Sequence, residues 1–401
     1  MKALPVLNRE NISDSELRNW PLSHLREIMV EMGKQCNVRC IMCFQTDFSP
    51  ATRTAEIIWK ERLLPAFECA ERLLISGGEP TILPGAKELL KTVTKEYGHL
   101  GLHTVTNGVQ FKGIWEETFL ALGGSVNFSL NSVDPSLYAR IVQFGRYDEV
   151  VANIDRLVAR KRQLGSKLVI RISSVVLDET IHELAGFIHW AAAHGLDEVL
   201  FNTDYLRGIK QHSPNQVHRY LAEAYAASDS YPHMRVLFLE DFDRVYARQH
   251  GLKPIRERSE TSRATGPCNM AFDSLSIRPD GDTFACCKTW YKIGNLIDSD
   301  LMSVWNSDAA YRFRRRMLGM DFRDCSVACD LNAKPVNKKI ADARKAYAVF
   351  KRDPKGAVKK GMRRLGLSNA QIDIPEGVKP KALTQLTGRI ENADSVSNHR
   401  N

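Results

Sequence analysis

The 401-residue sequence contains no long apolar run. From Met1 to Trp20 charges are scattered, and no apolar segment reaches the length of a signal peptide. No later run approaches the ~18 consecutive apolar residues that a membrane-spanning helix needs. We therefore expect a soluble, cytoplasmic protein. Strong compositional bias is also absent, since 43% of the residues are hydrophobic and 26% are charged, which is ordinary for a globular chain.

Cysteine, by contrast, is abundant. Nine cysteines in a cytoplasmic protein indicate metal or redox chemistry rather than disulfides. Cys36, Cys40 and Cys43 follow an apolar run with the spacing C-x3-C-x2-C. Thiolates hold 4Fe-4S clusters, normally four to a cluster, so three would leave one iron without a protein ligand. Such an open position can take a substrate. The alternative interpretation is a zinc site or three reduced thiols.

The chain from residue 26 onward alternates between short apolar segments and helical segments. Six strands alternating with helices predict an α/β fold with a parallel sheet and right-handed crossovers. The expected strands are residues 26–32, 72–76, 102–106, 125–130, 168–176 and 198–202, and the expected helices begin near residues 84, 113, 135, 147, 180 and 214.

Distinctive residues follow four of these strands. They are the cysteine loop, Gly77-Gly78-Glu79-Pro80, Thr106-Asn107-Gly108 and Ser129-Leu130-Asn131. In parallel sheets ligands bind beyond the carboxyl ends of the strands. We therefore expect one pocket to collect all four segments.

This order of motifs resembles the radical S-adenosylmethionine (SAM) enzymes over residues 26–234. The resemblance implies a partial parallel (β/α)6 barrel. It also implies that S-adenosyl-L-methionine chelates the unique iron of a 4Fe-4S cluster, and that an external electron donor such as flavodoxin or ferredoxin reduces this cluster. The cofactor is then cleaved to a 5′-deoxyadenosyl radical that abstracts a hydrogen from the substrate.

The same resemblance implies roles for individual residues. Glycines allow close backbone approach and a carboxylate accepts from an ammonium, which suits Gly77, Gly78 and Glu79 to the methionine amino group. Asn107 is a further cofactor-binding candidate. Ser129 and Asn131 lie where the family commonly contacts the ribose, with Asn131 replacing the usual acid, and Arg140 or Arg171 is the candidate for the carboxylate. Arg171 interrupts an apolar strand, which is costly without a partner. A structural ion pair is the alternative role for it.

A second cysteine set begins after residues 253–267, which are polar and suit a domain junction. Cys268 precedes an expected hairpin of residues 274–277 and 283–286, and Cys286 ends its second strand. Cys325 and Cys329 follow. Four cysteines can close a cluster site, and a four-cysteine zinc site is the alternative.

This region resembles the SPASM domain or its shorter twitch relative. The matching features are Gly281-x4-Cys286, Gly294-Asn295-Leu296, Trp305-Asn306-Ser307 and Cys325-x3-Cys329. A full SPASM domain has about seven cysteines, whereas five occur here, so the resemblance implies one auxiliary 4Fe-4S cluster held by Cys268, Cys286, Cys325 and Cys329. Neighbouring strand residues face opposite sides. Cys287 is therefore a spare core thiol, a replacement ligand or a reactive thiol that donates hydrogen.

The expected domains are a lead-in (1–25), the radical SAM core (26–240), the SPASM/twitch-like domain (254–332) and a basic helical tail (333–401). Residues 334–364 carry twelve Lys/Arg against Asp342 and Asp353, a local charge of +10 out of a net +9. We interpret this charge as a solvated helical face. Nucleic acid, an acidic protein or a membrane surface are alternative partners.

Three functions fit this sequence. The first is oxidation or epimerisation of a small polar molecule such as an aminocyclitol or a sugar. The second is modification of a ribosomally made peptide, although only about 25 residues precede the first strand, where many such enzymes have a leader-binding domain. The third is an iron-sulfur protein that binds or modifies RNA through the basic tail.

Overall fold

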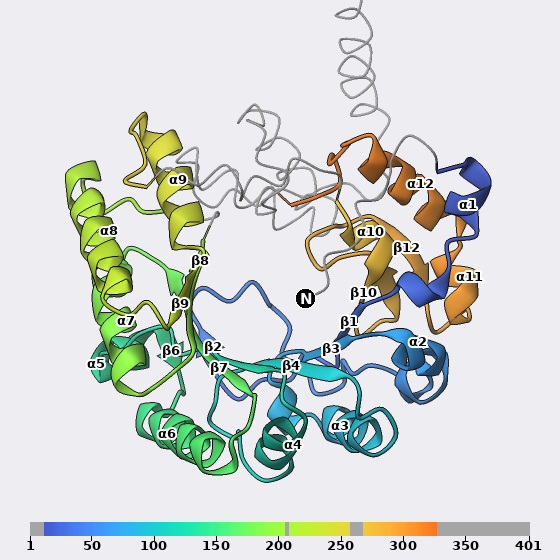
Figure 1. Ribbon diagram of the computed structural model, residues 1–401, viewed down its shortest axis with the longest axis horizontal. Coiled ribbons are helices and arrows are strands. Elements are labelled where there is room, and N and C mark those ends of the chain that lie inside the picture. The colour runs from blue at the N-terminus through green and yellow to red at the C-terminus, as the bar shows by residue number, and fades with distance from the viewer. Residues whose placement is uncertain (1–11, 205–207, 257–267, 327–401) are drawn as a thin grey trace, which may run out of the picture. The chain divides into compact units, whose positions relative to one another are not determined.

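The computed structural model describes residues 12–204, 208–256 and 268–326 (Figure 1). Within them, ten strands form one sheet in the order β12-β11-β10-β1-β3-β4-β5-β7-β8-β9, and β2 pairs with β6 separately. All pairings from β10 to β9 are parallel. The strands are β1 (Glu27–Glu31), β2 (Arg39–Cys40), β3 (Arg72–Ser76), β4 (Gly101–Thr106), β5 (Ser125–Phe128), β6 (Val142–Gln143), β7 (Val169–Val176), β8 (Glu198–Thr203), β9 (Arg235–Leu237), β10 (Ser274–Ile277), β11 (Asp282–Phe284) and β12 (Lys292–Asn295).

Helices cover the outer face of the curved parallel sheet (Figure 1). They are α1 (Asp14–Arg18), α2 (Leu64–Cys69), α3 (Pro84–Glu96), α4 (Ile114–Leu122), α5 (Pro135–Ile141), α6 (Tyr147–Leu164), α7 (Leu184–Ala193), α8 (Pro214–Asp229), α9 (Leu239–His250), α10 (Met270–Asp273), α11 (Leu301–Trp305) and α12 (Asp308–Leu318), with short turns η2 (Leu22–His24), η3 (Ile58–Arg62), η4 (Pro80–Ile82) and η5 (Ile181–Glu183). The α/β class, the partial parallel barrel and the six expected strands are confirmed. β9 is a further parallel strand that was not predicted from the sequence.

The two faces of the sheet differ in burial. In β1 and β3 alternate residues, Ile28, Val30, Leu73 and Ile75, are fully buried and belong to the hydrophobic core. The residues between them, such as Leu74, are only half-buried. Successive strand residues point to opposite faces. The outer face therefore packs under the helices, and the inner face is left available to line a site.

The parallel sheet continues into the C-terminal part of the chain. β10 pairs with β1 from Glu27–Ser274 to Val30–Ile277, and β11 and β12 then extend the sheet in the antiparallel sense. The expected hairpin is confirmed, but β11 ends at Phe284. The expectation that Cys286 ends this strand is therefore wrong. The domain boundaries stay a prediction.

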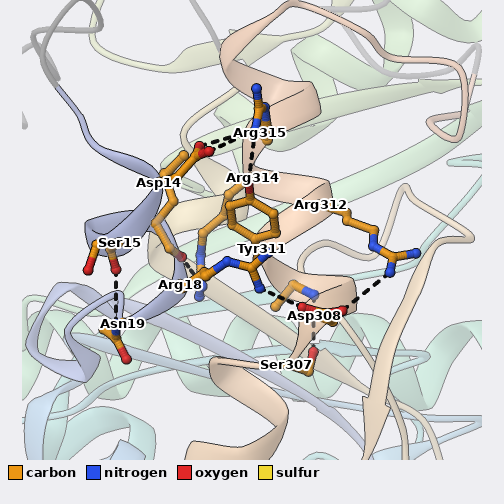
Figure 2. Close-up of polar contacts among 12 residues, drawn as sticks. Asp14, Ser15, Arg18, Asn19, Ser307, Asp308, Tyr311, Arg312, Arg314 and Arg315 are labelled. Atoms are coloured by element: carbon orange, nitrogen blue, oxygen red, sulfur yellow. Dashed lines mark hydrogen bonds and ion pairs between the residues drawn. The ribbon is translucent and has the colours of Figure 1, made fainter.

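The lead-in segment packs against the C-terminal part of the chain. Helix α1 contacts α12, and Figure 2 shows two ion pairs between them. Asp14 pairs with Arg315 at 3.0 Å, and Arg18 pairs with Asp308 at 2.6 Å. All four side chains are largely exposed, so each pair adds little to stability.

Buried contacts hold the same junction more firmly. Trp20 Nε1 donates to the carbonyl of Phe272 at 2.9 Å, and Trp305 Nε1 donates to the carbonyl of Trp20 at 2.8 Å. Arg314 is 1% exposed, donates to the carbonyl of Ala271 and lies over the Trp305 ring. These bonds fix the N-terminal segment beside the region that holds the second cysteine set. The predicted tail and Cys329 lie outside the described residues.

Candidate functional site

The turn after β3 lies directly against the segment that leads into the cysteine loop. Gly78 N–H donates to the carbonyl of Gly33, and Glu79 N–H donates to that of Gln35, both at 2.9 Å. A Cβ atom at Gly78 would lie 2.4 Å from the Gln35 carbonyl oxygen. Gly77 has a φ of 152° and its Cβ would lie 2.8 Å from the Gly33 oxygen. Both positions therefore require glycine for the two backbones to meet.

The carboxylate of Glu79 is buried and accepts four hydrogen bonds. Oε1 accepts from the Thr81 N–H and hydroxyl and from the Thr106 hydroxyl at 2.7 Å, and Oε2 accepts from Asn107 N–H at 2.6 Å. Burial raises the pKa of Glu79, and these four hydrogen bonds oppose the increase. The carboxylate thus ties the end of β4 to the turn after β3. Oε2, with a single described donor, retains an acceptor position for a ligand.

Asn107 connects this carboxylate to the cysteine loop. Its amide nitrogen lies 2.8 Å from Asn37 Oδ1 and 4.0 Å from Cys36 Sγ, and its oxygen accepts from Val109 N–H. Asn107 therefore lies beside the cysteine loop, and its contact with the cofactor stays a prediction. Asn37 and Thr106 contribute to the site without having been predicted as ligands, although Asn37 adjoins Cys36 and Thr106 belongs to the segment Thr106-Asn107-Gly108.

The cysteine loop is fixed by its own backbone. β2, which contains Cys40, pairs with β6. Cys43 N–H donates to the carbonyl of Cys40 at 3.0 Å, and Arg39 donates to the carbonyl of Cys36 at 2.8 Å. The β2–β6 pair was not predicted, because two-residue strands carry no periodicity. It holds the loop at the carboxyl end of β1.

The three thiols of this loop lie close enough to influence one another. Burial raises the pKa of Cys36, with smaller contributions from Glu79 and Cys43. The pKa of Cys40 is raised to about 12, mostly by burial and to a lesser degree by the two other thiols. Grouped thiolates near a carboxylate need a cation to offset their charge. Three sulfur donors in one loop fit an iron-sulfur cluster with one open iron.

Ser129 and Asn131 follow β5, at the same end of the sheet. Ser129 N–H donates to the carbonyl of Thr106. Asn131 has a φ of 64°, and its side-chain amide donates to the Ser129 carbonyl and accepts from Val175 N–H. The Asn131 side chain thus braces the end of β5 against β7. A cofactor contact by Ser129 or Asn131 stays a prediction.

The two candidate arginines lie apart from each other. Arg140, on α5, is exposed and forms no ion pair with any described residue. Arg171 is the third residue of β7 and pairs with Glu198, the first residue of β8. It therefore lies toward the amino-terminal ends of the strands, away from the cysteine loop. The expectation that Arg171 binds the cofactor is corrected, and its role as a partner of a buried carboxylate is the one that the structure supports.

Arg171 instead lines a cavity of about 400 Å³, which we call the amino-end cavity. Its lining includes the first residues of β3, β8 and β9 (Arg72, Glu198 and Arg235) and the third residues of β4, β5 and β7 (His103, Asn127 and Arg171). This cavity was not predicted from the sequence. Its signal in the sequence is a polar or charged residue at the first or third position of each of these strands.

The second cysteine set gathers near the other end of β1. Cys268 and Cys325 are buried, and Cys268 contributes to the raised pKa of Cys286. Thr289 forms a bridge with Cys325, which brings Cys325 beside the turn that follows Cys286. The described residues therefore bring together three of the four expected ligands, and Cys329 lies outside them.

Cys286 and Cys287 lie in a turn beyond β11, so the alternation of strand faces does not apply to them. The Cys286 thiol donates to Cys287, which raises the pKa of Cys286 and lowers that of Cys287 to about 7. The Ser274 hydroxyl donates to the carbonyl of Ala285, and Ser274 is in register with Glu27. Both cysteines thus lie near the amino end of β1.

No three histidine, cysteine or acidic side chains among the described residues already surround a point where a metal ion would fit. The metal-ligand assignments therefore rest on the sequence pattern and on the grouping of the thiols. Likewise, no described helix is long and apolar enough to cross a membrane.

Comparison with protein families gives two matches. Residues 30–191 match the radical SAM superfamily, and residues 268–330 match SPASM, described as an iron-sulfur cluster-binding domain. Curated relatives include GTP 3′,8-cyclases of Vibrio vulnificus strain YJ016 (27% identity, covering 39% of this chain and 47% of the relative) and Nitrobacter hamburgensis (28%, covering 45% and 51%). The chain thus spans about half the length of these relatives.

Solved structures with a similar fold include Streptococcus suis SuiB bound to the precursor peptide SuiA. It has a TM-score of 0.56 and 18% identity, and the match covers 78% of this chain and 73% of SuiB. A histidine-tagged anSMEcpe with bound AdoMet has a TM-score of 0.55 and 13% identity, covering 84% of this chain and 96% of that chain. At these identities the similarity shows the shared fold.

Proposed function

Because this chain belongs to the radical SAM superfamily and carries a C-terminal SPASM iron-sulfur domain, we propose that it removes two electrons from a small polar molecule. Its cofactors are S-adenosyl-L-methionine with a 4Fe-4S cluster, and an auxiliary iron-sulfur cluster. When bound, these groups supply a hydrogen-abstracting 5′-deoxyadenosyl radical and an acceptor for the second electron. A cytoplasmic location and an external electron donor stay predictions.

One observation carries this proposal. The two cysteine sets lie toward opposite ends of the same barrel, and a polar cavity opens at one of these ends. Cys36 to Cys43 follow the carboxyl end of β1, whereas Cys286 and Cys287 lie near its amino end. The amino-end cavity, at about 400 Å³, has room for a small molecule and is lined by charged and amide groups. Because a radical abstracts a hydrogen only on contact, this arrangement favours a small polar substrate that is held at the amino end and extends toward the carboxyl end, where the cavity reaches Val105, the fifth residue of β4.

Other residues of the chain bind and orient the cofactor in this proposal. Oε2 of Glu79 accepts the cofactor ammonium, and Asn107 keeps that oxygen in place. The Ser129 hydroxyl, which makes no hydrogen bond to another described residue, contacts the ribose. Arg140 is exposed on α5 and can turn toward the cofactor carboxylate. Four closed thiolates at the auxiliary site, Cys329 included, would leave no iron for the substrate to bind, which favours oxidation by electron transfer.

The proposal is tested by running the reaction in deuterated water. We expect a product two electrons more oxidised, with no deuterium at the reacting carbon, because oxidation delivers no hydrogen there. A thiol hydrogen exchanges with solvent, so hydrogen return from Cys287 would leave deuterium at an inverted centre. Deuterium that disappears in Cys287→Ala would refute oxidation in favour of epimerisation. Cys69→Ala is the matched control, because this thiol lies on α2 and donates to the carbonyl of Leu22.

Peptide modification is the second candidate. Two aromatic side chains close to the cysteine loop, Phe44 and Phe144, are 92% and 77% exposed, and a bound peptide would cover them. Phe144 directly follows β6, which pairs with the loop. A mass change on a peptide co-expressed with the chain, abolished by changing both aromatics to serine, would support this candidate over a small molecule. The RNA alternative concerns residues outside those described.

A further inference from the structure

The amino-end cavity lies on one face of the sheet. Arg72, Glu198 and Arg235 are first residues of their strands, and His103, Asn127 and Arg171 are third residues of theirs. First and third residues of a strand point to the same face. The cavity thus collects polar side chains from six neighbouring strands on rigid elements. A site built on strands holds its groups more accurately than one built on loops.

Guanidinium groups outnumber carboxylates around this cavity. Glu198 is buried, and its two oxygens serve two arginines: Oε1 accepts from Arg235 at 2.6 Å and Oε2 from Arg171 Nε at 2.8 Å. Arg72 pairs with Glu27 at 3.1 Å. Three arginines and two carboxylates leave one positive charge. An uncompensated cation in a partly enclosed space attracts an anion more strongly than one in open water.

Two buried polar atoms of the lining have no hydrogen-bond partner among the described residues. One is Oδ1 of Asn127, whose residue is 8% exposed, and the other is Nε of Arg72. A buried polar group without a partner costs about 1–3 kcal/mol relative to a satisfied one. Asn127 is in register with Arg171 on the neighbouring strand. The cavity therefore offers an unused donor and an unused acceptor next to its charges.

His103 lies within electrostatic reach of both arginine groups. Its pKa is lowered to about 4, mostly by burial and to a lesser degree by Arg72 and Arg171. His103 is consequently neutral at pH 7 and adds no charge. Arg72 on β3 and Arg171 on β7 line the same cavity as His103.

We propose that the amino-end cavity binds an oxyanion of the substrate, a carboxylate or a phosphate, with Arg72 and Arg171 as its cationic partners. Guanidinium groups suit both oxyanions because they donate parallel hydrogen bonds. Asn127 Oδ1 accepts a hydrogen bond from a hydroxyl group of the substrate that lies next to the anionic group. The inference rests on the proposed function only in naming the bound molecule as the substrate.

The test is equilibrium dialysis of the full, iron-reconstituted chain against labelled inorganic phosphate, acetate and, as the neutral probe, glycerol. We expect one of the two anions to bind at about one per chain, and glycerol to bind far more weakly. Phosphate binding would identify a phosphate-bearing substrate, and acetate binding a carboxylate. Absence of binding by both anions, or glycerol binding as tight as theirs, would overturn the inference.

Asn127→Asp is the decisive variant, because its carboxylate occupies the anion position beside Arg171. The substitution preserves size and breaks no hydrogen bond of the described residues. Anion affinity should fall at least about tenfold, since a like charge is introduced at short range. Arg72→Met should weaken binding too, and both Arg72 and Glu27 are exposed enough for the fold to tolerate it. Unchanged affinity in both variants would refute the proposed site.

Arg219→Met is the matched control. Arg219 is an exposed arginine on α8 with a loose pairing to Glu223 at 3.7 Å, so the change removes the same charge elsewhere and should leave anion affinity unaltered. Dialysis is run without S-adenosylmethionine and reductant. Failure of anion binding therefore counts against this site alone, whereas a wild-type chain that does not cleave S-adenosylmethionine counts against the proposed function alone.

Discussion

Replacing Glu79 by glutamine separates the two tasks that its carboxylate performs. The amide oxygen can keep the bond from Asn107 N–H, and the amide NH2 can donate to the hydroxyls of Thr81 and Thr106, which rotate to accept. Only the Thr81 N–H then lacks an acceptor, which costs about 1–3 kcal/mol. Part of this loss is offset, because the glutamine variant does not have to bury an ionised carboxylate. We expect the folded chain and its iron content to survive.

Cofactor binding should respond much more strongly. A hydrogen bond between an ammonium and a carboxylate contributes about 1.5–3 kcal/mol, which corresponds to about 10- to 150-fold in affinity. Anaerobic calorimetry of S-adenosylmethionine binding, with iron measured on the same samples, gives both quantities. Thr106→Val is the matched control, because it removes one hydrogen bond to Glu79 and keeps the charge. An affinity within twofold of wild type, with iron retained, would refute the assignment of Glu79.

The pH dependence of stability provides a second check on the same residue. Burial raises the pKa of Glu79 in the folded chain, so the folded state holds this proton more tightly than the unfolded state. Its contribution to stability is therefore largest at low pH and decreases as the pH rises through the folded pKa. The stability difference between wild type and Glu79→Gln, measured by urea unfolding at several pH values, should shift against the wild type as the pH increases. A difference that moves the other way would contradict the burial argument.

Two further predictions concern the clusters and the N-terminal junction. The reconstituted chain should hold about eight irons. Replacing Cys36, Cys40 and Cys43 by alanine should leave about four irons and abolish cleavage of S-adenosylmethionine. A triple variant that still cleaves S-adenosylmethionine would overturn the assignment of these cysteines to the radical SAM cluster. Burial lowers the pKa of Arg314 to about 9, which corresponds to a cost of up to about 5 kcal/mol for burying the charged guanidinium. Its hydrogen bond to a carbonyl and its contact with the Trp305 ring offset this cost. Arg314→Met should therefore change the free energy of unfolding by less than about 1.5 kcal/mol, and a loss above about 3 kcal/mol in urea unfolding would contradict this balance.

The sequence predicted those parts of the fold that depend on local pattern. Period-two apolar segments and turn residues located six strands, and β3 has the expected bounds of residues 72–76. The residues of the candidate cofactor site could be predicted for the same reason, because they directly follow strands. Glu79 and Asn107 are accordingly hydrogen-bonded to each other, although 28 residues separate them.

Pairings between distant segments could not be predicted in this way. Arg171 has the same local sequence whether its partner is a cofactor or Glu198, and only the register between β7 and β8 decides. The Asn131 side chain is likewise engaged by the next strand of the sheet. Cys287 was assigned a face by strand alternation, but β11 ends at Phe284 and the following residues turn. The register of neighbouring strands and the place where a strand stops are set by tertiary packing, which periodicity does not report.

The pairing of β1 with β10 has a consequence for biosynthesis. The two strands are separated by roughly 250 residues, so one edge of β1 has no partner until most of the chain has left the ribosome. At about 5–20 residues per second, this interval lasts about 10–50 seconds. The N-terminal helix α1 lacks its partner for longer still, because α12, which it contacts, is translated after β10. The cysteine loop that follows β1 is thus translated early onto an unfinished scaffold, and iron delivered at that stage would meet thiols whose surroundings are incomplete. Cluster insertion after β10 and α12 have been made is the order that this connectivity favours.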